Sequence, residues 1–254
     1  MVKHKASPMD IDVISEPQLK EPIMIAAWPG MGFLAKISAD FLRCRLEADK
    51  FVEIRCPQNV TIYKDSLAKL LSVRHRFFCV PDKNLIICVG DSQPSSPKEA
   101  INLAEQVIDI AEKYNVKMIY TMAAYPSDYP DTPKVYGVYN NRKLKERLEA
   151  YGIEFLEGEG AVNGLNGIII GIAKNRGIDG VCLMGEIKYT NIPQHLSSKA
   201  VLDKLSALLE FDLDTSQLIK RAEKINASIR MSLGEHENYA EYERNDEKNI
   251  RYIS

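Results

Sequence analysis

Short, continuous apolar runs recur along the chain and alternate with segments of helical periodicity. The clearest of these runs lie at residues 23–28, 85–89 and 181–184, and a further strand is expected at 118–122. A run without alternating polar positions is typical of a strand buried on both faces, as in parallel sheets covered by helices. Shorter strands are expected at 51–55, 134–139 and 154–156. Residues 56–84 are less regular, and we expect short strands and a small helix there.

Helical segments separate these runs. They are expected after residue 33, at 97–114 and 142–151, from the glycine-rich segment to about 177, and at 197–209 and 215–233. Ser96 starts a capping box, with Pro97 at the first helical position and Glu99 three residues after the cap. Asp214 is the predicted N-cap of the final helix. The alternation of strands and helices predicts a three-layer α/β/α fold around a mostly parallel central sheet.

The chain shows no shift in composition that would divide it into several domains. We predict one α/β domain at 22–233, preceded by an N-terminal arm at 1–21 that is ragged or forms an edge strand. A tail follows at 234–254. Residues 235–247 carry six acidic side chains and one arginine, so we predict that this tail is mobile.

Composition narrows the functional classes. Thirty-three Lys and Arg residues balance 35 Asp and Glu residues, for a net charge of −2, which argues against a nucleic-acid partner held by phosphate attraction. The five cysteines form no CxxC pair, so we interpret them as buried thiols in a reducing compartment, not as metal ligands. No signal peptide is recognisable, and no apolar run approaches the roughly 18 residues of a membrane span. We expect a cytoplasmic protein without a membrane partner.

Two glycine-rich segments are candidate ligand loops. Gly30 and Gly32 begin a GxGxxA pattern between a strand and a helix, with the acidic Glu53 about 20 residues further on, as in dinucleotide-binding folds. The alternative is a tight turn that only glycine fits. The second segment contains Gly160, Asn163, Gly164 and Gly167, with Gly171 beyond it. It either presents backbone N–H groups to an anion or allows close packing of a helix.

A third candidate is a pocket at the carboxyl ends of the strands, the edge where open α/β sheets bind ligands. Its members are predicted to be Gly30, Gly32, Asp91, Gln93, Tyr125 and Glu186. Asp91 and Glu186 either form an acid/base or metal pair or cap the helices that follow. The sequence contains no GxSxG, Walker A or HExxH motif, and we predict no catalytic residue, metal or cofactor. The four histidines are expected at the surface.

The end of the chain also suggests a binding role. The acidic tail ends in Asn249-Ile-Arg-Tyr-Ile-Ser254. A solvated tail has no stability reason to end in apolar and aromatic side chains, whereas a peptide that inserts its tip into a partner's pocket does. We predict that Ile250, Tyr252, Ile253 and Ser254 contact a partner. The alternative is packing against the chain's own domain or a neighbouring subunit. The tyrosines between 120 and 139 are equally compatible with an interface and with internal packing.

Several segments together resemble the PAC2 family, the family of proteasome assembly chaperone 2 and its archaeal relatives. They occur in the family's order over about residues 20–230. They are Pro29-Gly-Met-Gly-Phe-Leu-Ala35, Val89-Gly-Asp-Ser-Gln-Pro94, Pro133-Lys-Val-Tyr-Gly137, Gly160-Ala-Val-Asn-Gly-Leu-Asn-Gly167 and Met184-Gly-Glu186.

The resemblance implies a phosphorylase/hydrolase-like α/β fold, a homo-oligomer, and a role in assembling or docking onto the 20S proteasome or its α subunits rather than catalysis. Some archaeal relatives resemble activators that insert a C-terminal hydrophobic–Tyr–any motif between α subunits. Here Tyr252 is third from the end, not penultimate, and Arg251 holds the hydrophobic position. The rival hypothesis is a hydrolase or ligase of the same fold that acts on a small anionic or nucleotide-like substrate.

Overall fold

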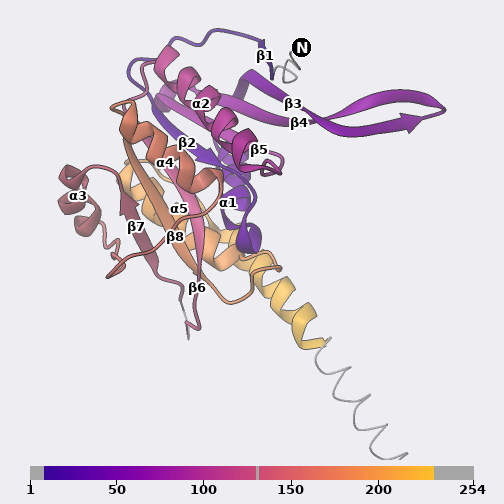
Figure 1. Cartoon of the computed structure of the whole chain (residues 1–254). Helices are drawn as coiled ribbons and strands as arrows, with labels where there is room; N and C mark the ends of the chain where they lie inside the picture. Colours follow the sequence, from indigo (N-terminus) through magenta and orange to yellow (C-terminus); the bar gives the residue numbers. More distant parts are fainter. Residues whose placement is uncertain (1–8, 130–131, 232–254) are drawn as a thin grey trace, which may run out of the picture.

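One eight-stranded sheet forms the centre of the molecule, with the strand order β1-β3-β4-β5-β2-β6-β8-β7 (Figure 1). The computed structural model describes residues 9–129 and 132–231 of the 254-residue chain. The predicted tail at 234–254 lies outside these ranges. The strands are β1 (Asp10–Val13), β2 (Ile23–Ala27), β3 (Asp49–Lys64), β4 (Leu67–Val80), β5 (Leu85–Gly90), β6 (Met118–Pro126), β7 (Val135–Tyr139) and β8 (Asp179–Ile187).

The sheet is mixed. Its four central strands, β5, β2, β6 and β8, are parallel. Strands β4, β3 and β1 continue it antiparallel on one side, and β7 is antiparallel at the other edge. The predicted α/β class is therefore confirmed, but the prediction of a mostly parallel sheet applies only to the centre.

The antiparallel part of the sheet includes most of residues 56–84, which do not form the predicted short strands and small helix. Most of this segment belongs to one long hairpin, β3–β4. Asp65 and Ser66 take φ values of 50° and 63°, and the pair Lys64↔Leu67 flanks them. Two consecutive residues at positive φ form the tight turn whose twist matches that of a hairpin, so the chain reverses there without an intervening helix.

Helices cover both faces of the sheet (Figure 1). Helices α1 (Leu34–Arg45) and α5 (His195–Leu208) pack on one face, and α2 (Pro97–Lys113) and α4 (Leu165–Asn175) pack on the other. The short α3 (Lys145–Ala150) lies beside β7. The 3₁₀ turns are η1 (Met31–Phe33), η2 (Pro81–Lys83) and η3 (Arg142–Leu144). The three layers agree with the prediction, and each helix buries its apolar stripe against the sheet.

The predicted N-cap at Ser96 is present, because its hydroxyl accepts from the backbone N–H of Glu99 at 3.3 Å. The last helix begins at Ser216, so Thr215 occupies the cap position in place of the predicted Asp214. The Asp214 carboxylate still accepts from the backbone N–H of Ser216 at 3.0 Å. The predicted strand at 154–156 is reduced to one bridge, between Glu154 and Tyr136.

The last helix occupies residues 216–231 of the described chain and extends away from the sheet (Figure 1). Its inward stripe begins with Leu218, which is fully buried, and continues through Ala222. Further along, Ile225 and Ile229 are only half-buried. The helix therefore leaves the body while keeping apolar residues at helical spacing.

The cysteines are only partly as predicted. Cys79, Cys88 and Cys182 are buried, and burial raises the pKa of each thiol. Cys44 lies exposed on α1, so the prediction of a buried thiol is wrong there.

Candidate functional site

The carboxyl ends of β2 and β5 mark the place where the chain changes sides of the sheet. Strand β2 leads into α1 on one face, whereas β5 leads into α2 on the other. Open α/β sheets bind ligands at such a point. The predicted pocket residues lie on this edge, and their hydrogen bonds show what the edge does in this protein.

The turn after β2 is held in place by the loop that precedes α5. The Gly32 N–H donates to the Thr190 carbonyl at 2.6 Å, and the Gln194 N–H donates to the Gly32 carbonyl at 2.9 Å. Gly32 has a φ of +59°, and a Cβ there would lie 2.5 Å from Gln194 Cγ. Gly30, just before η1, has an extended backbone. The geometry of Gly32 is that of a tight turn accessible only to glycine.

Gln93 bridges this turn to α4. Its side-chain amide donates to the Pro29 carbonyl at 2.9 Å and accepts from the Leu165 N–H at 3.0 Å. The Asn166 side chain adds a second bridge, accepting from the Trp28 N–H at 2.9 Å and donating to the Trp28 carbonyl at 3.1 Å. These amides fill the switch point and lock α4 to β2.

The glycine-rich loop packs closely where it enters α4. Gly164 has a φ of +74°, and a Cβ at Gly167 would lie only 2.0 Å from the Val162 carbonyl oxygen. Gly160 and Asn163 lie in the approach to the helix and are exposed. The N–H groups of Gly167 and Ile168 donate to the Gly164 carbonyl at 3.1 and 3.0 Å. Together with the Leu165 N–H, three of the first four N–H groups of α4 already have protein acceptors, which favours packing over anion binding.

Asp91 and Glu186 do not form a pair. In the sheet, β2 and β6 lie between the strands that carry them, and three strand spacings amount to roughly 14 Å. Asp91 binds the Arg76 guanidinium through two hydrogen bonds of 2.9 and 3.0 Å. Each of the two carboxylates thus has separate partners, which does not favour a shared acid/base or metal role.

The Glu186 side chain is only slightly exposed and organises the end of β8. Its carboxylate accepts from the Ser127 hydroxyl at 2.9 Å, the Lys134 N–H at 2.8 Å and the Tyr136 hydroxyl at 3.3 Å. Burial, followed by the charge of Glu186, raises the pKa of Tyr136. The Tyr125 ring packs edge-on against Tyr136, with centroids 5.2 Å apart. Three donors on one carboxylate are typical of a structural anchor.

The prediction of surface histidines is wrong for His75. Its side chain is 1% exposed, and its Nδ1 accepts from Trp28 Nε1 at 3.0 Å. Burial lowers the pKa of His75 to about 4, so the ring is a neutral acceptor at pH 7. A Cβ at Gly90 would lie 2.1 Å from Trp28 Cδ1, so a glycine at the end of β5 makes room for the indole.

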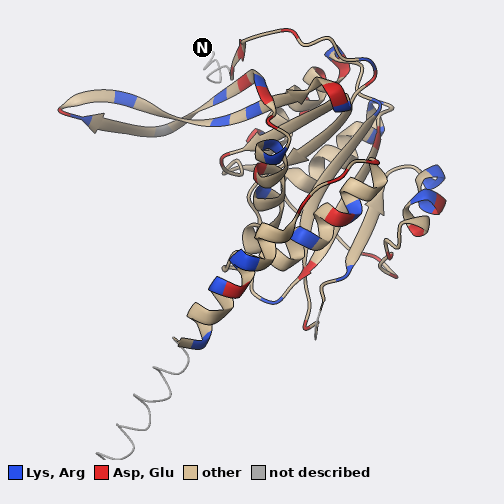
Figure 2. Ribbon diagram, turned by 180° about the vertical axis from the view of Figure 1, so that it is seen from behind, with Lys and Arg blue, Asp and Glu red and all other residues tan. Residues whose placement is uncertain are grey.

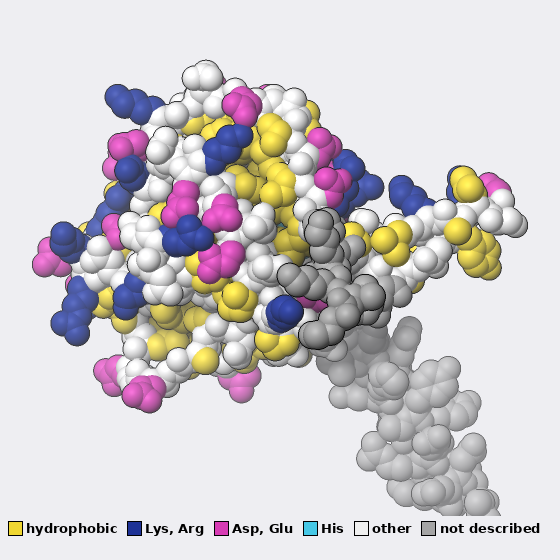
Figure 3. Space-filling view, turned by 45° about the horizontal axis from the view of Figure 1, so that its top comes forward, with side chains coloured by type: hydrophobic (Ala, Val, Ile, Leu, Met, Phe, Trp, Pro, Cys, Tyr) yellow, Lys and Arg dark blue, Asp and Glu magenta, His cyan; other side chains and the backbone are white. Residues whose placement is uncertain are grey.

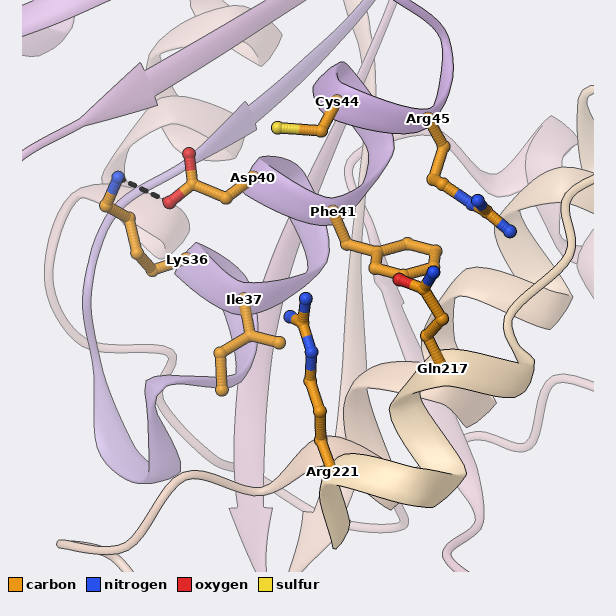
Figure 4. Close-up of a pocket in the computed structure, with 8 residues that line it drawn as sticks. All are labelled: Lys36, Ile37, Asp40, Phe41, Cys44, Arg45, Gln217 and Arg221. Atoms are coloured by element: carbon orange, nitrogen blue, oxygen red, sulfur yellow. Dashed lines mark hydrogen bonds and ion pairs between the residues drawn. The ribbon is translucent and has the colours of Figure 1, made fainter.

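Two grooves that the sequence reading missed lie along helix 216–231. The first, of about 310 Å³, separates this helix from α1. In Figure 4 Arg221 and Gln217 reach across it toward Ile37 and Phe41. The second groove, of about 390 Å³, lies between the same helix and the loop before α5, and Tyr129 and Lys188 are among its lining residues. The sequence carries a signal only for the second groove, because the apolar stripe at 218, 222, 225 and 229 continues to Ile225 and Ile229, which line that groove.

The described residues give no indication of a metal site or of a helix that spans a membrane. Within residues 9–129 and 132–231, no group of three or more His, Cys, Asp or Glu side chains could hold a metal ion. None of the helices found in those ranges is long and apolar enough to cross a membrane. The predicted contact residues Ile250, Tyr252, Ile253 and Ser254 lie outside the described residues.

Comparison with known proteins shows to which family the chain belongs. The model of the PAC2 family matches residues 24–231. The chain belongs to the PAC2 family. The PAC2 match includes the β2 turn, the glycine-rich loop and the described part of helix 216–231.

Individual proteins are similar to this PAC2 chain over most of its length. The crystal structure of Pyrococcus furiosus PbaB, described as an archaeal proteasome activator, is 28% identical with a TM-score of 0.78, over 88% of this chain and 98% of that one. PbaA of the same organism, described as an archaeal homolog of proteasome-assembly chaperone, shares the fold at 22% identity and a TM-score of 0.73, over 95% and 99%. An uncharacterized Methanocaldococcus jannaschii protein is 28% identical over 92% of this chain and 93% of its own.

Proposed function

We propose that this PAC2 protein is a non-catalytic scaffold that binds the 20S proteasome or its α subunits in the cytoplasm. The observation that carries the proposal is the whole-length similarity to PbaB, at 28% identity and a TM-score of 0.78, because PbaB is described as a proteasome activator. The family's link to proteasome assembly supports the same partner.

The strand-end edge supports a scaffold rather than an enzyme. The groups that an α/β enzyme would direct toward a substrate, those of Gln93, Asp91 and Glu186, are bound to other parts of the chain. A catalytic carboxylate needs a free face toward its substrate. These contacts favour the scaffold over the hydrolase or ligase alternative.

The second part of the proposal concerns how the scaffold reaches its partner. Helix 216–231 extends away from the body (Figure 1), and the sequence continues for 23 residues from 232 to 254. We assign the partner contact to Ile250, Tyr252, Ile253 and Ser254 at the end of that segment, and we expect the scaffold to be a homo-oligomer that presents several such ends.

Native mass spectrometry of the full-length protein mixed with the cognate 20S proteasome tests this proposal. We expect a mixed complex, and we expect at least tenfold weaker binding for Tyr252→Ala and for deletion of 249–254. Tyr242→Ala, a tyrosine substitution in the same acidic tail, is the matched control and should change binding less than twofold.

The outcomes separate the parts of the proposal. Failure of the full-length protein to bind the proteasome or its α subunits would refute the proteasome role. Binding that survives the deletion would refute only the assignment to the tail. Retention of a small molecule by the purified protein would revive the enzyme hypothesis.

A further inference from the structure

The hairpin β3–β4 extends well beyond the rest of the sheet. Strand β1 pairs with β3 only as far as Arg55, and β5 pairs with β4 only as far as His75. From 57 to 72, a segment that we call the hairpin extension, the two strands are paired with each other and, within the described ranges, with nothing else. Its eight-residue strand 57–64 is about 26 Å long at about 3.3 Å per residue. Figure 1 shows the extension projecting from the body.

Large apolar side chains cover this extension. Their exposed fractions range from 37% to 80%. They belong to Val60, Ile62, Tyr63, Leu67, Leu70 and Leu71. The strand register places Tyr63 and Leu70 on one face and Ile62 and Leu67 on the other. Both faces therefore carry apolar side chains, although Lys64 and Lys69 share the face of Ile62 and Leu67. Hydrophobic side chains stand out along the extension in Figure 3.

Such an element is unfavourable when left alone in water. A two-stranded hairpin is marginally stable by itself, and proteins usually protect exposed strand edges with short strands, charges or proline. The extension has one proline, Pro57 at its base, and its charged residues are Lys64, Asp65 and Lys69. The extension therefore has the composition of an element that another protein surface covers.

A surface of complementary character lies at the edge of the same sheet. Strand β1 is an outermost strand, and Ile11, Val13 and Ile14 at this edge are 40%, 47% and 49% exposed. Asp10 and Asp12 alternate with these residues, and the Asp12 carboxylate also binds the Arg55 guanidinium at 3.1 Å. This β1 edge, residues 10–14, is apolar with two acidic side chains, whereas the extension is apolar with two lysines and one aspartate. Two extensions packed on each other would instead bring together surfaces of the same net charge.

We propose that the hairpin extension of one copy lies against the β1 edge of a neighbouring copy, head to tail. The extension cannot reach its own β1 edge, because it continues along β3 away from the residues that pair with β1. Added strand pairing and apolar contacts would hold the neighbour. Such a contact leaves one free extension and one free edge at the two ends of an open chain until a ring closes. The inference rests on the homo-oligomer part of the proposed function.

Two full-length variants and a control test the contact by native mass spectrometry at equal protomer concentration. The extension variant carries Ile62→Thr, Leu67→Thr and Leu70→Thr, since threonine retains strand propensity. The edge variant carries Ile11→Thr, Val13→Thr and Ile14→Thr. The control replaces Ile101 and Val138, which are exposed elsewhere, by threonine. Far-UV circular dichroism verifies that each variant is folded.

We expect the wild type and the control to have the same oligomer mass and each variant alone to be monomeric. Mixing the two variants should give a 1:1 heterodimer, because one brings an intact edge and the other an intact extension. This complementation is the signature of a head-to-tail contact.

Other results would overturn the proposal in distinguishable ways. A monomeric wild type would refute it together with the homo-oligomer, while proteasome binding is measured separately. An extension variant that keeps the wild-type mass would refute it alone. An edge variant that remains oligomeric would show that the extension contacts something other than β1. Loss of proteasome binding by the extension variant, with its oligomer mass intact, would identify the proteasome as the occupant.

Discussion

Two glycines of α4 should respond to the same substitution with opposite signs. Gly167 and Gly171 lie one helical turn apart. A Cβ at Gly167 would lie 2.0 Å from the Val162 carbonyl oxygen and 2.7 Å from its carbonyl carbon, whereas a Cβ at Gly171 would have no neighbour within 4 Å. Gly167→Ala and Gly171→Ala therefore separate close packing from helix propensity within one helix.

The magnitudes follow from two competing terms. Alanine in a helix interior is favoured over glycine by about 0.5–1 kcal/mol, and Gly171→Ala should gain stability by that amount. At Gly167 the same gain is opposed by overpacking, which typically costs about 1–3 kcal/mol. The neighbour here is backbone rather than a flexible side chain, so the upper end applies, and we expect a net loss of about 2 kcal/mol.

Urea unfolding followed by circular dichroism, at one protomer concentration, measures both changes. The two variants should differ by about 3 kcal/mol in the free energy of unfolding. Equal stabilities, or a Gly167→Ala variant as stable as the wild type, would refute the interpretation that the glycine-rich loop exists for close packing. The loop would then be free to serve a ligand.

Two further substitutions test the polar anchors. Asn166→Ala leaves the buried N–H and carbonyl of Trp28 without the Asn166 amide, and it should lower the free energy of unfolding in urea by about 2–4 kcal/mol. The control Asn102→Ala, at an exposed position, should change that free energy by less than about 0.5 kcal/mol. Similar losses in the two variants would contradict the bridging role of Asn166. Burial alone would raise the pKa of Glu53, but hydrogen bonds from Arg55 and a lysine outweigh it and lower the pKa to about 2. The stabilisation that ionised Glu53 contributes to folding is therefore present above about pH 5 and lost toward about pH 2. Glu53→Gln should flatten the dependence of the unfolding free energy on pH in this range. Parallel curves of unfolding free energy against pH for wild type and variant would contradict this.

The sequence predicted those parts of the fold that depend on residues close to each other along the chain. The Ser96 cap and the hydrogen bond between Asp214 and the Ser216 N–H use residues only two or three positions apart. The central strand at 85–89 is apolar throughout because helices cover both faces of the sheet there. Each of these features can be read from a short window of sequence.

The features that the sequence reading missed depend on distant or external partners. Gln93 accepts from the backbone of Leu165, 72 positions away, and no local pattern assigns that role. His75 was placed at the surface because Arg74 and Arg76 flank it. Strand alternation puts a residue on the face opposite to both of its neighbours, so two flanking arginines in β4 were in fact a signal for an inward histidine.

The hairpin extension was missed for a different reason. Its apolar residues do not pack in the core of this chain, so the rule that apolar patterns reveal buried faces does not apply to them. The same argument bears on function. The polar groups at the strand ends hold the fold together, while apolar surface that a monomer would bury is carried outward on the hairpin extension. Helix 216–231 projects at another side of the molecule (Figure 2). In the proposed function, the hairpin extension would join copies of the chain, and helix 216–231 would lead toward the proteasome partner.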